Sequence, residues 1–390
     1  MKAIKTLLLT AIALTAIACF NIKVSASELA LTIRAGDSVY YYSGEEIAFY
    51  KGKYYLKGCL GAVDGIYYDT LTPSVNASAT FVGGKSPTFN FSSEKLGRGI
   101  DKPDLLTKID NALNNGVKEI SAKFIDIQPE ITLAELKKQT FLRATFKTDY
   151  SLSSHERKHN IELACKKING KVLGVGEVFS FNEVVGERSE DNGFKNAVVI
   201  LNGEYTTGVG GGVCQVSTTL YNCALLSGLK TSERHPHSLL PSYVKPSLDA
   251  MVSGSSCDLK FVNTTQGKVY ISAYANGNTV TFSIYGLKPE FEYKLSSTVL
   301  EKTEPPPPQI TINESLGANE VVILKTAKPK IKSKAELITL KNGKQVGVLT
   351  LHFDEYKSVQ GKIEMGKPMI NEQTSLFYLT KVVYHYKISV

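Results

Sequence analysis

The stretch GVGGGVCQVSTTLYNC, residues 208–223, joins a glycine-rich loop to a run of helix-forming residues. Glycine adopts backbone conformations that other residues avoid, so a loop with four glycines can turn sharply and pack closely. The run that follows predicts a helix from about Cys214 to Ser227, with Gly228 as its C-cap. The sequence therefore places the thiol of Cys214 where a flexible loop becomes the first turn of a helix.

This position makes Cys214 a candidate nucleophile. The thiolate is the reactive form of cysteine, and the unpaired N–H groups and dipole of a helix N-terminus lower the pKa of a thiol there. Gly211, Gly212 and Gln215 are candidate donors of hydrogen bonds to an oxyanion formed on a substrate. The hydroxyl groups at 217–219 are candidate caps of the first helical turn. The alternative is a buried structural cysteine that follows a glycine turn.

A cysteine nucleophile needs a base. The run ERHPHS at 233–238 supplies His235 and His237 about twenty residues further along the chain. A segment that returns along the helix brings an imidazole back to the helix's first turn. Asp249 or Asp258 is then available to orient the imidazole, which gives the order Cys–His–Asp along the chain.

A second motif suggests different chemistry. The run HERKH at 155–159 matches the zinc-binding pattern H-E-x-x-H, with His155 and His159 as ligands. A zinc-binding helix of that class is buried, whereas the residues around this motif are polar, namely Ser154, Arg157, Lys158 and Asn160. No third ligand follows in the sequence. We therefore predict a solvated, polar helix start, no metal site and no cofactor.

The remaining cysteines and histidines favour structural roles. Of the six cysteines, five follow the N-terminal segment, and an odd number leaves at least one thiol unpaired within the chain. Cys165 and Cys223 lie among apolar residues at helical spacing and are predicted to belong to the core. His352 and His385 lie in alternating runs and are predicted to be solvated strand residues.

The composition favours a folded protein that meets a polyanion. The chain has 390 residues, of which 43% are hydrophobic, and a net charge of +8 that is spread along the sequence. Lys and Arg form no basic arm of the kind that binds nucleic acid, so no nucleic-acid partner is predicted. A diffuse positive charge suits a long polyanion such as a cell wall.

Residues 1–26 have the features of a secretory signal. Lys2 and Lys5 precede an apolar run, and a small-x-small pattern ends at Ala26, where cleavage is expected. An uncleaved membrane anchor and acylation of Cys19 are the alternatives. No later segment is long and apolar enough to span a bilayer, so contact with a membrane is expected only through this segment. We predict an extracellular protein associated with the cell wall.

The predicted fold class is α+β, in three parts. Residues 27–145 form a small α+β domain, in which strand-like runs flank a helix over KPDLLTKIDNALNNG. Residues 146–290 contain the candidate site, on a helix against antiparallel strands. A proline-rich linker at 291–309 precedes a small all-β module at 310–390, with LKNGKQ at 340–345 as a turn.

Four segments of the central domain closely resemble the VanW family, which is named from a vancomycin-resistance cluster. They are NIELACKKINGKVLGVGEVFSFNEVVGERS (160–189), GVGGGVCQVSTTLYNCALLSGL (208–229), ERHPHSLLPSYV (233–244) and LDAMVSGSSCDLKFVN (248–263). The first domain resembles the peptidoglycan-binding domain that often precedes VanW. The C-terminal module resembles, more loosely, the five-glycine β module that often follows it.

The resemblance implies roles for particular residues. The family's Gly-Gly-Gly-x-Cys-Gln element falls on residues 210–215. Its Arg-x-Pro-His-Ser element falls on residues 234–238, which favours His237 over His235 as the base. The family's Asp-Ala element gives Asp249 and its later Asp gives Asp258, and of the two we predict that Asp249 orients the base. The candidate substrate-binding residues are Arg234, Ser238 and Tyr243.

The resemblance also implies a reaction, L,D-transpeptidation of peptidoglycan. The Cys214 thiolate would attack the carbonyl of the third residue of a stem peptide, release the terminal D-Ala and pass the acyl group to a neighbouring stem as a 3–3 cross-link. Peptidoglycan stem peptides are the expected partners. Two alternatives remain open. One is a non-catalytic wall-binding or accessory protein of cell-wall remodelling or glycopeptide resistance, and the other is a peptidoglycan hydrolase.

Overall fold

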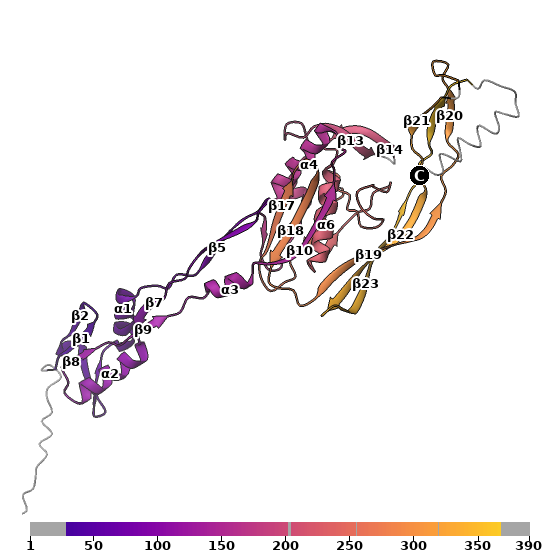
Figure 1. The fold of residues 1–390 in the computed structure, drawn as a ribbon. Helices are drawn as coiled ribbons and strands as arrows, with labels where there is room; N and C mark the ends of the chain where they lie inside the picture. Colours follow the sequence, from indigo (N-terminus) through magenta and orange to yellow (C-terminus); the bar gives the residue numbers. More distant parts are fainter. Residues whose placement is uncertain (1–28, 202–203, 255, 319, 368–390) are drawn as a thin grey trace, which may run out of the picture. The chain divides into compact units, whose positions relative to one another are not determined.

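A computed structural model of the protein describes residues 29–201, 204–254, 256–318 and 320–367. The chain divides into two compact units (Figure 1). One unit consists of the chain up to Asn76 together with Glu94–Glu130, and the other consists of Ala77–Ser93 together with the chain from Ile131 onward. Helices and mainly antiparallel strands occur in both units, so the α+β fold class predicted from the sequence is confirmed.

The first unit is a small α+β fold of short strands and helices. Its elements are β1 (Leu31–Ala35), β2 (Ser38–Tyr42), a 3-10 turn (Gly44–Glu46), β3 (Ile47–Tyr50), β4 (Lys53–Leu56), α1 (Cys59–Thr70), β7 (Gly97–Ile100), α2 (Lys102–Asn114), β8 (Glu119–Ser121) and β9 (Phe124–Ile127). Strand β1 pairs with β2 antiparallel and with β8 parallel. Helix α2 begins after Asp101, whose carboxylate accepts a hydrogen bond from the Asp104 N–H, and it buries Leu105, Ile109 and Leu113 at the predicted helical spacing.

Helix α1 is a helix that the sequence pattern does not predict. Its segment contains Gly61 and Gly65, which disfavour a helix, and two adjacent tyrosines, which favour a strand. Val63 and Ile66, three residues apart, are buried in the same core as the apolar face of α2. Packing of this face against α2 therefore overrides the local propensity.

A four-stranded antiparallel sheet covered by two helices forms the centre of the second unit. The elements are β10 (Phe141–Asp149), α4 (His155–Ile168), β11 (Val172–Leu173), α6 (Val213–Leu226), β17 (Val269–Ala275) and β18 (Thr279–Gly286). The strand order is β10–β18–β17–β11. Helices α4 and α6 contact each other, α4 lying on β17 and α6 on β10 and β18 (Figure 1). Cys165 and Cys223 are buried in the shared core, as predicted.

Helix α6 is buried along almost its whole length, although its sequence is rich in hydroxyl and amide groups. Ser217, Thr218, Thr219 and Asn222 are fully buried. Ser217 donates a hydrogen bond to the carbonyl oxygen of Ala250 (2.6 Å), and Asn222 donates one to that of Leu248 (2.7 Å). Because buried polar groups are stable only when hydrogen-bonded, these contacts fix the segment around residue 249 against the helix.

Smaller sheets surround this centre. The elements are β12 (Val178–Ser180), α5 (Phe181–Val185), β13 (Asn196–Leu201), β14 (Glu204–Val209), β15 (Lys230–Glu233) and β16 (Lys260–Val262). Strands β12, β16 and β15 form one antiparallel sheet, and β13 pairs with β14. Strand β14 leads directly into the glycine loop before α6, and β15 leads from α6 to the His-Pro-His turn.

Residues 77–93, which the sequence places within the first domain, pack in the second unit. They form the antiparallel pair β5 (Ser78–Val82) and β6 (Thr88–Ser92), and α3 (Leu133–Lys138) lies on β5. Phe81 and Phe89 contact the rings of Tyr270 and Tyr285, with centroids 5.0 to 5.9 Å apart. These aromatic contacts attach the pair to the central sheet.

The C-terminal part of the chain is all β over its described residues. Its strands are β19 (Glu292–Thr303), β20 (Gln309–Ile312), β21 (Val321–Lys325), β22 (Lys330–Lys341), β23 (Lys344–Tyr356) and β24 (Lys362–Met365). Strand β19 occupies most of the stretch predicted as the linker 291–309, because its residues pair with β22 along its whole length. Phe291 and the stretch at 304–308, with its four prolines, lie outside a strand. The predicted turn joins β22 to β23 through Asn342 and Gly343, both at positive φ.

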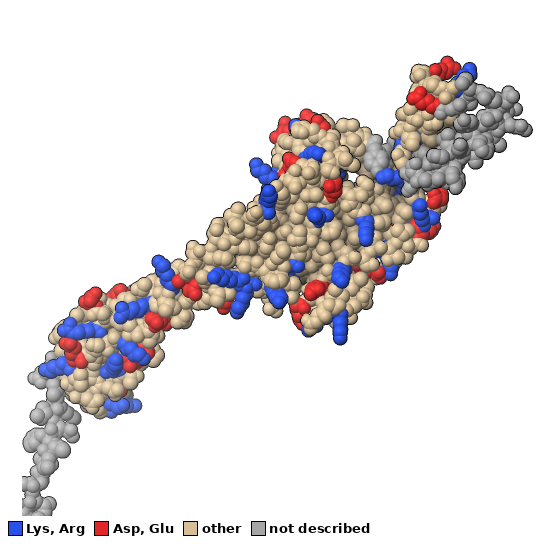
Figure 2. Space-filling model, viewed as in Figure 1, with Lys and Arg blue, Asp and Glu red and all other residues tan. Residues whose placement is uncertain are grey.

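Figure 2 shows Lys and Arg side chains distributed over the visible face, with Asp and Glu among them, rather than gathered in one patch. Across the described residues, no helix has the length and apolarity needed to cross a membrane. The predicted signal at 1–26, with Cys19, and the predicted strand residue His385 lie outside the described residues.

Candidate active site

The glycine-rich loop before α6 is held by contacts that leave no room for side chains. Gly212 caps the helix with a φ of 104°, and a Cβ there would lie 2.9 Å from Arg157 Cγ and 3.0 Å from Ile161 Cγ1. A Cβ at Gly211 would lie 2.6 Å from the carbonyl oxygen of Val198. The turn therefore requires glycine both for its backbone conformation and for its packing.

Helix α6 begins without a side-chain cap, so the prediction that hydroxyl groups at 217–219 cap its first turn is wrong. Ser217 donates instead to the carbonyl oxygens of Cys214 and Ala250. Among the described residues, no backbone acceptor takes the N–H of Cys214. The first turn thus keeps an N–H group and the positive end of its dipole close to the thiol.

Cys214, His237 and Asp249 lie together as a thiol, an imidazole and a carboxylate. The Cys214 side chain is partly exposed, and its Sγ lies 3.4 Å from the carbonyl oxygen of Val252. His237 Nδ1 donates to Asp249 Oδ2 at 2.6 Å, and the His237 backbone N–H donates to the same oxygen at 2.7 Å. This leaves Nε2 of the imidazole free to interact with the Cys214 thiol, whose pKa His237 lowers.

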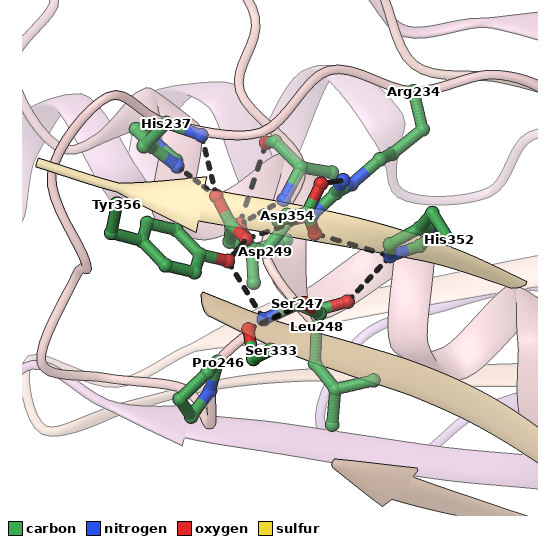
Figure 3. A network of polar contacts seen from close by, with 12 residues as sticks. Arg234, His237, Pro246, Ser247, Leu248, Asp249, Ser333, His352, Asp354 and Tyr356 are labelled. Atoms are coloured by element: carbon green, nitrogen blue, oxygen red, sulfur yellow. Dashed lines mark hydrogen bonds and ion pairs between the residues drawn. The ribbon is translucent and has the colours of Figure 1, made fainter. Parts of the chain in front are cut away.

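Asp249 is fully buried and is held by donors on both carboxylate oxygens. Oδ1 accepts from Arg234 Nη2 at 2.8 Å and from the Tyr356 hydroxyl at 2.6 Å. Arg234 also donates to the backbone oxygen of Asp249 and pairs with Asp354 at 2.7 Å (Figure 3). Since every donor favours the ionised carboxylate, Asp249 is fixed in position and in charge.

The turn before Asp249 is held by strands β22 and β23. Ser247 has a φ of 60°, a conformation that is costly for a residue with a side chain. Its N–H donates to the Tyr356 hydroxyl, its hydroxyl bonds Ser333, and its carbonyl oxygen accepts from His352 Nε2 at 2.6 Å (Figure 3). The prediction of a solvated His352 is therefore wrong, because its side chain is only 21% exposed and fixes this turn.

The sequence gives a weak signal for these supporting residues. Asp354 and Tyr356 lie about a hundred residues after Asp249, outside the segments that carry the family resemblance. Ser333 occupies an inward position between Ile331 and Ala335 in the alternating strand β22, and inward positions are normally apolar. A polar residue at such a position indicates a buried hydrogen bond, but it does not identify the partner.

The charges of the three residues suit a thiolate–imidazolium pair. Burial raises the pKa of the Cys214 thiol, but the hydrogen bond and charge of His237 outweigh it, so the pKa lies below its ordinary value. Burial lowers the pKa of His237, whereas Asp249 and Cys214 raise it to about 9. Burial also opposes ionisation of Asp249, yet His237 and Arg234 bring its pKa to about 2. At neutral pH the imidazole is therefore protonated, and its positive charge favours ionisation of the Cys214 thiol.

A comparison with known families identifies the domain that carries this arrangement. Residues 156–285 match the family model of VanW-like proteins. The chain carries a VanW domain. The match contains Cys214, His237 and Asp249 and confirms the resemblance inferred from the sequence motifs.

Two curated relatives contain similar sequence. The "Uncharacterized protein YoaR" of Bacillus subtilis is 36% identical over 173 residues, which are 44% of this chain and 56% of that protein. The "Vancomycin B-type resistance protein VanW" of Enterococcus faecalis is 28% identical over 169 residues, which are 39% of this chain and 61% of that protein. The match thus spans less than two thirds of either relative.

Two solved structures show a local likeness to a fifth of the chain. HP0197-G5 is 18% identical and is covered completely, with 20% of this chain matched and a TM-score of 0.12. The G5 domain of an IgA1 protease is 20% identical, with 95% of it and 21% of this chain matched and a TM-score of 0.14. Scores this low support no conclusion about fold or function.

The VanW domain opens a cleft of about 2050 Å³ at the thiol. Cys214 lines it, as do His237 and the predicted substrate-binding residues Ser238 and Tyr243. Arg234, the third predicted substrate-binding residue, does not line the cleft, because its guanidinium is buried between Asp249 and Asp354. Its position fits a residue that holds Asp249 rather than one that binds substrate.

Gln215 lies beside the cleft, but its side-chain donors are already used. Its Nε2 donates to Thr148 Oγ1 at 3.0 Å and to the carbonyl oxygen of Asp149 at 2.7 Å. Its Oε1 accepts from Arg157 at 2.8 Å. The prediction that Gln215 donates to an oxyanion therefore does not fit the geometry. The N–H groups of Gly211, Gly212 and Cys214 have no backbone acceptor among the described residues, so donation by the two glycines stays a prediction and Cys214 adds a third candidate donor.

The alternative base and orienting residues lie elsewhere in the VanW domain. His235 is more than a third exposed and contacts Glu233 at 3.1 Å. Asp258 accepts hydrogen bonds from the Ser180 hydroxyl (2.5 Å) and from the N–H groups of Asn182 and Leu259. These bonds connect the segments around β12 and β16, and none of them involves His237. Of the residues that the sequence left open, His237 and Asp249 are the pair that the fold brings to Cys214.

The HERKH motif opens helix α4 without a group of potential metal ligands among the described residues. His155 is exposed, and His159 bonds the carbonyl oxygen of Gly193. The prediction of a solvated face is wrong for Asn160, which is fully buried and donates to the carbonyl oxygens of Lys195 and Gly211. This amide ties helix α4 to the glycine loop.

We expect Cys214 to be alkylated at a lower pH than an ordinary cysteine. The rate of alkylation rises with the thiolate fraction, and the His237 cation stabilises that thiolate. A His237→Gln variant removes the cation and should shift the pH midpoint upward. The measurement is the rate of iodoacetamide labelling against pH, read by peptide mass spectrometry. Cys59, whose pKa burial raises, serves as internal reference. Labelling of Cys214 at or above the midpoint of Cys59 would contradict the ion pair.

Proposed function

We propose that the protein is an exported cell-wall enzyme, a cysteine L,D-transpeptidase that acts on peptidoglycan stem peptides. The proposal depends on one observation, the joint placement of Cys214, His237 and Asp249 at an open cleft. A nucleophile, a base bonded to it and a carboxylate that orients the base are the parts that covalent acyl transfer requires.

The first half of the reaction forms a thioester. The Cys214 thiolate attacks the carbonyl carbon of the donor's third residue, and the N–H of Cys214 stabilises the negative oxygen. As the tetrahedral intermediate collapses, the C–N bond to the terminal residue breaks. The imidazolium of His237 gives its Nε2 proton to the leaving amine, so a free amino acid departs and a neutral imidazole remains.

The second half transfers the acyl group to an amine. The neutral imidazole of His237 takes a proton from the side-chain amine of a neighbouring stem peptide as that amine attacks the thioester carbon. The C–S bond breaks, the thiolate of Cys214 returns, and the new amide is a 3–3 cross-link. The thioester conserves the energy of the cleaved peptide bond, so no nucleotide cofactor is needed.

The cell-wall assignment is supported by three observations. One relative bears the name of a vancomycin B-type resistance protein. The first 26 residues have the pattern of a secretory signal, and the net charge of +8 favours a polyanionic surrounding. None of these identifies the reaction, which depends on the site alone.

A purely structural role for the three residues is disfavoured by its energetic cost. Charged side chains are expensive to bury, and apolar residues of similar size would build the same core at least as stably. A wall-binding protein has no need to ionise a thiol at the edge of a cleft. A hydrolase would use the same thiol with water as acceptor, so the two enzymes differ only in the second half of the reaction.

The test is incubation of the purified protein with muropeptides that carry tetrapeptide stems, followed by mass spectrometry. The expected products are 3–3 linked dimers and free D-Ala. Tripeptide monomers without dimers would establish the hydrolase instead. If the muropeptides are recovered unchanged while the protein still binds them, the accessory wall-binding function holds and the enzyme proposal fails.

A further inference from the structure

Two arginines line the cleft that contains the thiol, and neither forms an ion pair with a carboxylate among the described residues. Arg157 and Arg188 are both half-buried, and both interact electrostatically with Cys214. Among the described residues, neither guanidinium forms an ion pair with Asp or Glu. Arg234, in the same domain, makes the contrast clear, because it is paired with two carboxylates, Asp249 and Asp354.

The partners of the two cleft arginines are neutral. Arg157 donates to the Ser153 hydroxyl at 2.5 Å and to Gln215 Oε1 at 2.8 Å. Arg188 donates from Nη2 to Asn182 Oδ1 at 2.5 Å. Asp149, Glu183 and Glu187 line the same cleft without reaching either guanidinium. Neither guanidinium therefore has a bonded carboxylate among the described residues, although Asp258 and Cys214 interact electrostatically with Arg188.

Arg188 also has a buried donor that is not used. Its Nε is shielded from solvent and has no hydrogen-bond partner among the described residues. Gly210, at a φ of 83°, packs on the arginine, since a Cβ there would lie 2.9 Å from Arg188 Cβ. Asn182 is fixed in turn by hydrogen bonds to the carbonyl oxygens of Gly254 and Cys257. The glycine loop thus packs on the aliphatic part of the Arg188 side chain, while Asn182 positions its guanidinium.

An unpaired donor and a charge without a bonded counter-ion are costly in a half-buried position. A ligand that supplies an anion offsets this free-energy cost. A guanidinium group matches a carboxylate in geometry as well as in charge. The adjacent thiolate is a single charged atom and offers only a Coulomb contact to Arg188. The geometry is therefore suited to a planar anion brought in by the substrate.

We propose that Arg188, assisted by Arg157, binds a carboxylate of the acyl-donor peptide that lies next to the bond being cleaved. This deepens the proposed function, on which it rests for the identity of the peptide. Two carboxylates meet the description. One is the free C-terminus of the residue that leaves, and the other is a side-chain carboxylate on the third residue. Either would set the donor in register with the Cys214 thiol.

Binding to a Cys214→Ala variant tests this site without turnover. Three tetrapeptides serve as probes. The first has lysine as third residue and a free C-terminus, the second is the same peptide as C-terminal carboxamide, and the third has diaminopimelic acid as third residue and a carboxamide end. We expect one of the two peptides with a carboxylate to bind about 10- to 100-fold more tightly than the second peptide in calorimetry. The preferred peptide identifies which carboxylate is bound.

Arg188→Gln in the Cys214→Ala background should reduce that ratio to near one, and Arg188→Lys should restore it only in part. Lys171→Gln, which removes an exposed charge outside the cleft, should leave the ratio unchanged. Equal affinity for all three peptides, or a ratio that survives Arg188→Gln, would overturn the proposal. Because the comparison uses an inactive protein, a carboxylate preference without any 3–3 dimers from the wild type would refute the transpeptidase and leave this site standing.

Discussion

A Cys214→Ser variant is expected to lose acyl transfer almost completely, with a rate lowered on the order of 10⁴-fold. In the proposed mechanism the His237 cation, which lowers the pKa of the Cys214 thiol, stabilises the sulfur as the anion of an ion pair. A serine hydroxyl is far too weak an acid to form such a pair. The substitution also leaves the backbone N–H of residue 214 in place, so binding and oxyanion stabilisation persist while the nucleophile is lost.

The measurement is the mass of the protein after brief incubation with tetrapeptide muropeptides. Wild type should gain the mass of the donor less one terminal residue, as a thioester that hydroxylamine removes. Cys59→Ser is the matched control, because Cys59 lies in the other compact unit. It should form the adduct like wild type. An adduct or 3–3 dimers with Cys214→Ser would show that another residue is the nucleophile.

Much of the candidate site follows from the sequence because its parts are local. The change from glycine loop to helix places Cys214 within one turn, and the rule that a helix N-terminus favours anions needs no knowledge of the fold. The His-Pro-His turn, which supplies the imidazole, is also close in the sequence, since it follows shortly after the same helix. The family resemblance matches both Asp249 and Asp258, whereas the fold gives a physical reason for Asp249, since Ser217 and Asn222 of α6 hold its neighbours.

The remaining features depend on contacts between distant segments. From the sequence alone, Gln215 resembles a free hydrogen-bond donor. In the fold, its side-chain amide donates to Thr148 and to the carbonyl oxygen of Asp149, both in β10. From the sequence alone, Arg234 resembles a surface cation that binds substrate. In the fold, its guanidinium is buried and pairs with Asp354 of β23. Such contacts arise from the packing of elements that are distant in the sequence, and a hydrophobic pattern does not specify which polar residues this packing places opposite one another.

The most disruptive change to the support of the site is Asp249→Asn, which should both destabilise the second unit and slow acyl transfer. It leaves the buried Arg234 with only Asp354 as counter-ion, and breaking one side of a buried ion pair typically costs about 3–5 kcal/mol. An amide also presents an N–H to the imidazole and favours the wrong tautomer of His237, which lowers the rate on the order of 10⁴-fold in comparable triads. Urea unfolding and the muropeptide assay measure the two effects.

Tyr356→Phe is the milder partner of this substitution, because it removes one hydrogen bond to Asp249 and the acceptor for the Ser247 N–H but no charge. We expect the free energy of unfolding to fall by about 1–3 kcal/mol and the tautomer of His237 to be preserved. If Tyr356→Phe slows the reaction as much as Asp249→Asn, the carboxylate acts only through the packing of the turn, and its role in orienting His237 fails.

The pH dependence of stability separates the charge of Asp249 from its packing. The pKa of Asp249 falls from 3.8 to about 2 on folding, so its contribution is present above pH 3.8 and is lost as the pH falls toward 2. The pKa of His237 rises from 6.5 to about 9, so its contribution is complete below pH 6.5 and is lost as the pH rises through 9. The gap in unfolding free energy between wild type and Asp249→Asn should therefore be widest between about pH 4 and 6.5. It should narrow toward pH 9 without closing, since Arg234 stays charged there. A gap independent of pH across this range would mean that the carboxylate and the imidazole do not interact as ions.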